Sequence, residues 1–227
     1  MNLWDARDST SLSPFSQETY AETFNDSENP TFDSLLKSLE LIESGKFSIR
    51  SFGILREELK DVRKQLRQNP NDIKAHVKLG IIYRKLGQNQ EAITSYKKAI
   101  SIEPDYFNAH LNLGVAYYDE GRYQEAIASY KEAIRIKPDY ANAHYNLGLA
   151  YIKSGQYQEA IASSKESIRI KPDAIGAHLN LGTAYKKSGQ YKEAIASYKE
   201  ALRIKPDYAD AHYGLGSAYG DLGQYKE

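Results

Sequence analysis

The chain has 227 residues, of which 41% are hydrophobic and 26% are charged, and its 30 basic residues balance its 30 acidic ones. A net charge of zero gives no global argument for binding nucleic acid or a membrane surface, and we expect no nucleic-acid partner. The chain holds no cysteine, which excludes disulfides, thiolate metal sites and a cysteine nucleophile. No apolar run reaches the ~20 residues of a membrane span, and the first residues lack a secretory pattern, so we expect a cytoplasmic protein without a membrane span.

The first part of the chain is polar. Residues 1–32 are rich in Ser, Thr, Asn and acidic residues, and residues 1–33 contain seven acids and a single base, Arg7. Such a composition cannot bury enough apolar surface to fold, which predicts a disordered acidic tail over residues 1–32. A partner-binding role for Trp4 or Phe15 is the alternative.

Two helices are expected between the tail and residue 72. Apolar residues recur at helical spacing over 33–44 and again over 54–68. They are Leu35, Leu36, Leu39 and Ile42 in the first, and Leu55, Leu59, Val62 and Leu66 in the second. We interpret residues 33–72 as N-terminal helices that form a degenerate repeat or a cap, with a coiled-coil or dimerisation helix as the alternative.

From residue 70 onward the sequence repeats with a period of 34. The period is carried by Pro70, Pro104, Pro138, Pro172 and Pro206, by Gly80, Gly114, Gly148, Gly182 and Gly216, and by Gly87, Gly121, Gly155, Gly189 and Gly223. Residues 107–140 and 141–174 are identical at 24 of 34 positions. The pattern indicates tandem duplication of one structural unit.

Each unit is expected to form two helices. The apolar stripes of unit 107–140 are His110, Leu113, Gly114 and Tyr117 in the first helix, and Ala126, Ile127, Tyr130, Ala133 and Ile134 in the second. Gly121 is a natural left-handed stop between the helices, and Pro138 ends the second one. Asp139 is expected to cap the helix that follows. Since one helix pair cannot bury its apolar face alone, neighbouring pairs must stack.

This pattern resembles the tetratricopeptide repeat (TPR) family. The matching residues of unit 141–174 are His144 (usually Trp in the family), Leu147, Gly148, Tyr151, Gly155, Tyr157, Ala160 and Pro172, while Ser164 and Ser167 depart from the usual aromatic and alanine. The resemblance covers residues 73–227 and implies an all-α fold, a right-handed α-solenoid of antiparallel helix pairs whose first helices line a concave groove. It divides this part into four repeats over 73–208 and a truncated fifth over 209–227.

The resemblance implies a protein–protein interaction scaffold rather than an enzyme, with a partner peptide or helix in the groove. Residue Glu227 stands at position 19 of its unit, so either the natural chain continues or this end packs on another molecule. Two alternatives follow. The chain is the N-terminal TPR arm of a larger, glycosyltransferase-like enzyme, or it is a structural protein that self-associates through the unfinished C-terminal repeat.

All five histidines occupy one position of the repeat: His76, His110, His144, His178 and His212. A metal or pH-sensing ladder is the alternative to structural packing. Each repeat supplies one imidazole, and first helices of neighbouring repeats lie about 8–10 Å apart, whereas zinc needs several ligands near 2 Å from one ion. We therefore expect packing residues, and neither a metal nor a cofactor.

Asparagines recur on the side of the first helix that points into the expected groove: Asn112, Asn146 and Asn180 at one position, with Asn108 and Asn142 four residues earlier. A carboxamide offers a donor and an acceptor, so a row of them can pair with the backbone of an extended peptide. The row is similar to the asparagine ladder of the TPR arm of O-GlcNAc transferases. The alternative to a peptide-binding row is that asparagine is simply a common, solvated residue at this exposed position of the family.

Neighbouring positions are expected to select the side chains of the partner. Aromatic contact is expected from Tyr118, Tyr145 and Tyr213, and the cations Lys74, Lys78, Arg84, Lys85, Lys153, Lys186 and Lys187 outnumber the acids Asp119, Asp210 and Asp221. The excess predicts an acidic partner segment, against the alternative of a balanced, solvated face. We find no catalytic motif, because Gly214-Leu215-Gly216 lies within a predicted helix without a preceding strand.

Overall fold

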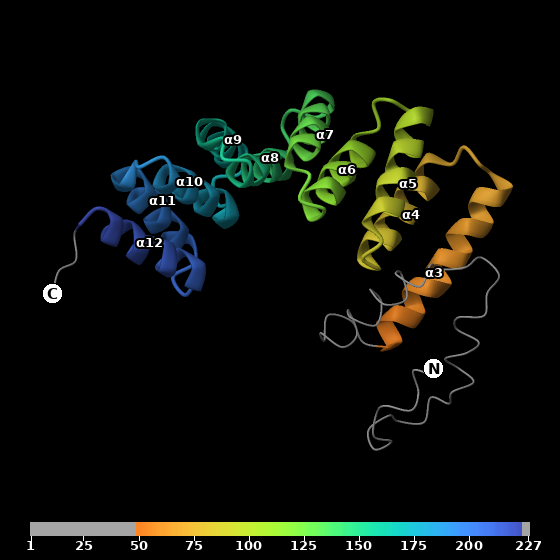
Figure 1. Cartoon of the computed structure of the whole chain (residues 1–227), viewed down its shortest axis with the longest axis horizontal. Helices are drawn as coiled ribbons and strands as arrows, with labels where there is room; N and C mark the ends of the chain where they lie inside the picture. Colours follow the sequence, from red (N-terminus) through yellow and green to blue (C-terminus); the bar gives the residue numbers. More distant parts are fainter. Residues whose placement is uncertain (1–48, 224–227) are drawn as a thin grey trace, which may run out of the picture. The chain divides into compact units, whose positions relative to one another are not determined.

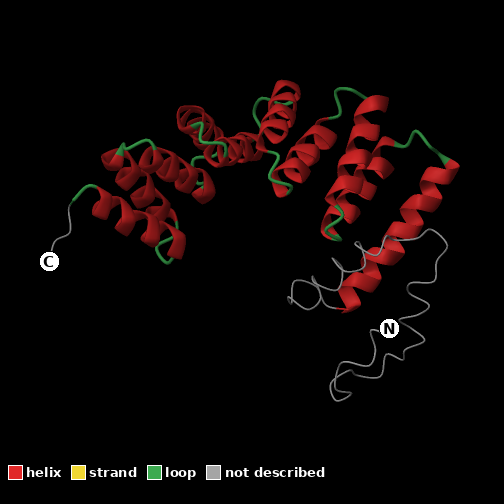
Figure 2. Ribbon diagram, in the orientation of Figure 1, coloured by secondary structure: helices red, strands yellow, loops and turns green. Residues whose placement is uncertain are grey.

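The structure is a computed structural model that describes residues 49–223, with side chains from residue 53 onward. The predictions for the tail and for helix 33–44 lie outside these residues. The described range contains helices and no strand (Figures 1 and 2). The helices are α3 (Ile49–Gln68), α4 (Ile73–Lys85), α5 (Asn89–Ile102), α6 (Phe107–Asp119), α7 (Tyr123–Ile136), α8 (Ala141–Lys153), α9 (Tyr157–Ile170), α10 (Ile175–Lys187), α11 (Tyr191–Ile204) and α12 (Ala209–Asp221).

The helices after α3 form consecutive antiparallel pairs. We call α4, α6, α8, α10 and α12 the A helices, and α5, α7, α9 and α11 the B helices. Each helix packs against the next one in the chain, and each A helix also contacts the A helix of the following repeat. This arrangement confirms the predicted all-α repeat solenoid. We call the surface formed by the row of A helices the A-helix face.

The predicted helix at 54–68 is confirmed, although α3 begins earlier, at Ile49. Leu55 and Val62 of its apolar stripe are buried. Two hydrogen bonds link the helix to the first repeat: Arg63 Nη2 donates to the Tyr83 hydroxyl at 3.1 Å, and Gln65 Nε2 donates to Asp72 Oδ2 at 2.7 Å. The interpretation of residues 33–72 as a degenerate repeat or a cap stays a prediction.

The turn between the A helix and the B helix of a repeat is formed around a glycine with a left-handed backbone conformation. Gly121 has φ +73°, and the four equivalent glycines have φ between +72° and +78°. In this conformation the Gly121 N–H donates to the Tyr118 carbonyl at 3.0 Å and the Arg122 N–H donates to the Tyr117 carbonyl at 2.9 Å, so the open carbonyls of the helix end are satisfied.

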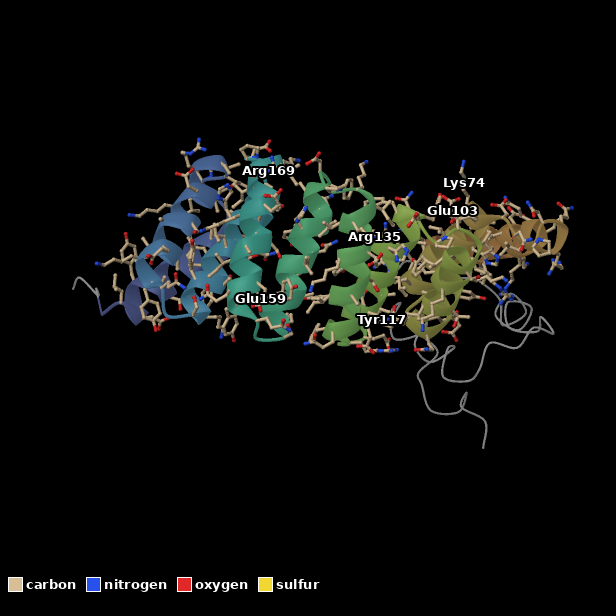
Figure 3. All side chains as sticks on the ribbon, turned by 90° about the horizontal axis from the view of Figure 1, so that it is seen from above. Lys74, Glu103, Tyr117, Arg135, Glu159 and Arg169 are labelled. Carbon is tan, nitrogen blue, oxygen red and sulfur yellow. The ribbon has the colours of Figure 1, made fainter. Side chains whose placement is uncertain are left out.

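The prediction that Asp139 caps α8 is wrong. The N-cap residue is Tyr140, which makes no side-chain cap bond, and Asp139 accepts a hydrogen bond from Arg169 Nη2 at 3.4 Å. Arg169 and its equivalent Arg135, labelled in Figure 3, each bond the aspartate that follows the preceding repeat proline. The capping position falls one residue later than that aspartate, and there the first repeat carries Asp72, whose carboxylate accepts from the Ala75 N–H at 2.9 Å.

Within a pair, an aromatic ring of the B helix lies on a glycine of the A helix. A Cβ added to Gly114 would lie 2.5 Å from Cε1 of Tyr130, and Gly80 and Gly182 face Tyr96 and Tyr198 in the same way. These tyrosines are at most 3% exposed. The missing side chain lets the two helices pack closely around a ring, which is why glycine recurs at this position.

The third repeat, residues 141–174, lacks this ring. Ser164 and Ser167 are both fully buried there. Ser167 Oγ donates to the Ala141 carbonyl at 2.9 Å, while Ser164 Oγ finds no hydrogen-bond partner among the described residues. A serine fills far less space than a tyrosine, so this pair lacks the ring that fills the other three described pairs.

Successive repeats are joined by a recurring cation–π contact. A lysine of each B helix lies over an A-helix tyrosine of the next repeat, with Nζ 5.6–5.8 Å from the ring centroid. The pairs are Lys97 with Tyr117, Lys131 with Tyr151, Lys165 with Tyr185, and Lys199 with Tyr219. The contact recurs with the sequence period, so it supports one relative placement of neighbouring repeats. Among residues 49–223, every helix is too short or too polar to cross a bilayer.

The buried tyrosines make stability sensitive to alkaline pH. Burial raises the pKa of Tyr96 to about 12, although the nearby Arg84 partly opposes the shift; burial also raises the pKa of Tyr130. Because the folded-state pKa lies above the value of about 10 in the unfolded chain, this stability is complete below pH 10 and is lost as the pH rises toward 12.

We therefore expect the thermal midpoint to fall between pH 10 and 12, and to fall less steeply in Tyr96→Phe. Circular dichroism melting curves of both proteins at several pH values in that window measure the difference. Equal pH slopes for the wild type and Tyr96→Phe would contradict this assignment.

Candidate functional site

The A-helix face carries a half-buried apolar strip. Its members are Ile81 of α4, Leu111 and Val115 of α6, Leu149 and Ile152 of α8, and Leu179 of α10. Ile81, Leu111, Val115 and Ile152 pack with one side against buried core residues, as Leu179 does near the C-terminal end, so each is only partly open to water. Covering such partly exposed apolar side chains with another molecule is favourable, because it removes apolar surface from water.

Four of the five predicted asparagines lie together on α6 and α8. Asn108 and Asn142 are exposed, while Asn112 and Asn146 are half-buried. Asn112 Nδ2 donates to the Asn108 carbonyl of its own helix at 2.7 Å, which leaves its side-chain oxygen available as an acceptor. Asn146 makes no hydrogen bond within the described residues, so its whole carboxamide is available.

Asn180 differs from the open position expected from the sequence. Its side chain is only 7% exposed, and Nδ2 donates to the Tyr145 carbonyl of α8 at 3.2 Å. The serine of the third repeat explains the difference. The Tyr198 ring lies against Gly214, 16 residues later, and the residue 16 after Ser164 is Asn180, which occupies space that a ring takes elsewhere.

Tyr118 and Tyr145 bring aromatic surface to the same two helices. The Tyr118 ring lies 5.4 Å from that of Tyr123, centroid to centroid. Tyr145 reaches toward α10, where a Cβ on Gly176 would lie 2.8 Å from its Cε2. Burial raises the pKa of both phenols, and Tyr145 is among the groups that act on Tyr118. Tyr213 of α12 is 80% exposed, because no described helix follows α12.

Two of the predicted cations are neutralised within the protein. Arg84 Nη1 lies 3.2 Å from Asp119 Oδ2. Lys186 Nζ lies 3.8 Å from Asp221 Oδ2 and donates to Ser217 Oγ at 2.7 Å. Five cations of the face are exposed and make no ion pair within residues 49–223: Lys74, Lys78, Lys85, Lys153 and Lys187. Since Asp210 is the one acid of the predicted set left without a basic partner there, the uncompensated charge of the face is positive.

The histidines form a hydrogen bond that recurs in every described repeat. His110 Nε2 donates to the Pro104 carbonyl at 2.7 Å, and its four equivalents bond the proline six residues earlier at 2.7–2.9 Å. A carbonyl only accepts, so the proton is on Nε2. The ring thus ties the A helix to the preceding turn. Within the described part of the chain, no three His, Asp or Glu side chains gather as a metal site would require.

The sequence reasoning did not anticipate the charge pairing between neighbouring A helices. Arg84 and Asp119, like Lys186 and Asp221, are 35 residues apart, one more than the repeat period. A search for opposite charges at that separation would have found both pairs. The pairing shows that the last residue of an A helix lies beside the second-to-last residue of the preceding one.

These features define an all-α repeat protein with an open face of carboxamides, apolar side chains and unpaired lysines, the kind of fold that serves as a protein-interaction scaffold. A family model described as TPR repeat matches residues 80–121, 116–155, 148–189 and 183–223. The chain belongs to the tetratricopeptide repeat family.

Comparison with solved structures agrees with this assignment. A crystal structure of MamA is 32% identical with a TM-score of 0.65, and the match covers 69% of this chain and 92% of that one. YrrB, described as a TPR protein with an unusual peptide-binding site, is 20% identical with a TM-score of 0.64, over 73% and 85% of the two chains. TTC0263, a thermophilic TPR protein of Thermus thermophilus, is 25% identical with a TM-score of 0.58, over 82% and 98%. Comparison with curated proteins finds no match.

Proposed function

We propose that the protein is an interaction scaffold that holds an extended or helical segment of a partner protein along its A-helix face. The observation that carries the proposal is the group of four asparagines on α6 and α8, two adjoining A helices. The side-chain oxygen of Asn112 and the carboxamide of Asn146 are available to pair with a peptide backbone. Beside them, the apolar strip and the unpaired lysines offer contacts for side chains.

The proposed mechanism is binding geometry rather than chemistry. Each hydrogen bond to a peptide backbone contributes about 0.5–1.5 kcal/mol net, so a few carboxamides alone bind weakly and tolerate many sequences. Selectivity then depends on the side-chain contacts around them. The excess of unpaired lysines over acids favours an acidic partner segment. Asn180 takes no part in this proposal, because its donor is used within the fold.

The proposal is tested with peptides selected for binding from a random library displayed against the whole chain. In the double variant Asn112→Ala, Asn146→Ala we expect affinity for a selected peptide to fall about tenfold, since two hydrogen bonds are lost, with the circular dichroism spectrum unchanged. Isothermal titration measures the affinity. The matched control is Asn71→Ala, an exposed asparagine of a turn outside the A helices.

Unchanged affinity in the double variant, or a library that yields no binding peptide, would remove the proposal. Self-association is the second candidate, favoured by the exposed Tyr213 ring on α12. That candidate is supported instead if light scattering gives a molar mass that rises with concentration, and if the Tyr213→Ser variant keeps the molar mass of a single chain. The absence of catalysis and the cytoplasmic location stay predictions.

A further inference from the structure

The charges at the ends of the A helices are neutralised at the two outer junctions and unneutralised at the two middle ones. At each junction, the last residue of one A helix follows the second-to-last residue of the preceding A helix by 35 positions. The residues at this separation are Arg84 and Asp119, Tyr118 and Lys153, Ile152 and Lys187, and Lys186 and Asp221. The first and the fourth are ion pairs, whereas the second and the third combine an exposed lysine with a half-buried apolar or aromatic residue.

From this pattern we infer that Lys153 and Lys187 form a paired subsite for two acidic side chains of one extended partner segment, with an apolar partner residue seated on Tyr118 or Ile152. The inference rests on the proposed function and states which chemistry the face selects. Phenol and alkyl neighbours cannot neutralise an ammonium group, so these two charges are left for a ligand.

The spacing of the acids follows from the solenoid. Adjacent helices lie about 8–10 Å apart, and an extended chain advances about 3.3–3.6 Å per residue. A segment that crosses α8 and α10 therefore reaches both lysines with acidic residues about three positions apart. At the outer junctions, Arg84 and Lys186 are already paired with Asp119 and Asp221, so the preference for acidic side chains is limited to the two middle junctions.

Random peptides displayed against the full chain provide the first test. We expect the enriched peptides to carry two acidic residues about three positions apart with an apolar residue between or beside them. Enriched peptides without such a pair would overturn the inference and leave the proposed function standing. If no peptide is enriched, both fail.

Charge reversal provides the second test, on one selected acidic peptide. We expect Lys153→Glu and Lys187→Glu each to weaken its binding at least tenfold, as measured by fluorescence anisotropy. The control Lys192→Glu reverses an exposed lysine of B helix α11, and there the affinity stays within about twofold. The double reversal is expected to bind a peptide in which lysines replace the two acids.

Equal losses in Lys192→Glu and in the two A-helix variants would overturn the inference, since a general charge effect would then explain the binding. So would an acidic peptide that keeps its affinity when its two acids become glutamines. Binding that weakens in the asparagine double variant but not in the lysine variants would leave the scaffold proposal intact and remove this subsite alone.

Discussion

Replacing Tyr130 by Ser is expected to lower the free energy of unfolding by about 4 kcal/mol, in the range seen when large buried aromatic side chains are removed. The ring is 2% exposed and lies on Gly114, whose missing side chain cannot fill the space that the ring leaves. The neighbouring helices are held by the repeats on both sides, so they relax only in part. Urea unfolding followed by circular dichroism measures the change.

The chain contains its own matched control for this prediction, because Ser164 occupies the same position in the third repeat. We expect Ser164→Tyr to raise the free energy of unfolding by about 1–2 kcal/mol, since burying a large apolar side chain stabilises by about that amount. Gly148, opposite Ser164, has no side chain that would meet the new ring. The substitution exchanges the unpartnered Ser164 hydroxyl for a phenol hydroxyl, so the expected gain comes from the ring alone.

The ring at residue 164 is expected to displace Asn180 toward water, the half-buried state of Asn112 and Asn146. Side-chain amide resonances of Asn180 would report this in an NMR spectrum. A Ser164→Tyr protein less stable than the wild type would mean that the third helix pair has closed around its serines, and would refute the expectation that a ring is accommodated there.

Gly114→Ala is expected to lower the free energy of unfolding by about 1–2 kcal/mol, although alanine is the better helix former. The added Cβ would lie 2.5 Å from Cε1 of Tyr130, and forcing extra carbon into a filled core costs about 1–3 kcal/mol. The gain of up to about 1 kcal/mol from replacing glycine within a helix offsets only part of that cost. Urea unfolding again measures the result.

Two equivalent glycines turn this into a graded series. At Gly148 the nearest atom to an added Cβ is Ser164 Oγ at 3.0 Å, and at Gly216 nothing lies within 4 Å. We expect Gly148→Ala to be close to neutral, and Gly216→Ala to raise stability by about 0.5–1 kcal/mol through helix propensity alone. Equal effects at the three positions would show that the rings do not decide where glycine is required.

Much of the fold could be predicted from the sequence because the repeat makes local signals reinforce one another. Glycines with positive φ end the A helices, and prolines follow the B helices by two residues, as expected. Capping was predicted wrongly at Asp139, since the offset of one residue between the proline turn and the helix start depends on backbone geometry that the sequence pattern does not contain.

The candidate site was predictable only in outline. The periodic positions of Asn112, Asn146 and Asn180 placed all three on one face of the A helices, yet Asn180 is buried. Its burial depends on a serine in another helix, which a search within single helices does not connect to it. The partners of Arg84 and Lys186 were missed for the same reason, because each lies on the following repeat.

By itself, the sequence determined the class of the protein, the 34-residue unit, the two helices within it and the side of the A helix that stays outside the core. These follow from helical periodicity and from the conformations open to glycine and proline, which are local properties. Only the tertiary structure decided which charges are already neutralised and which carboxamides are open. Both depend on distances between side chains of different repeats, and those distances are set by how the helix pairs stack.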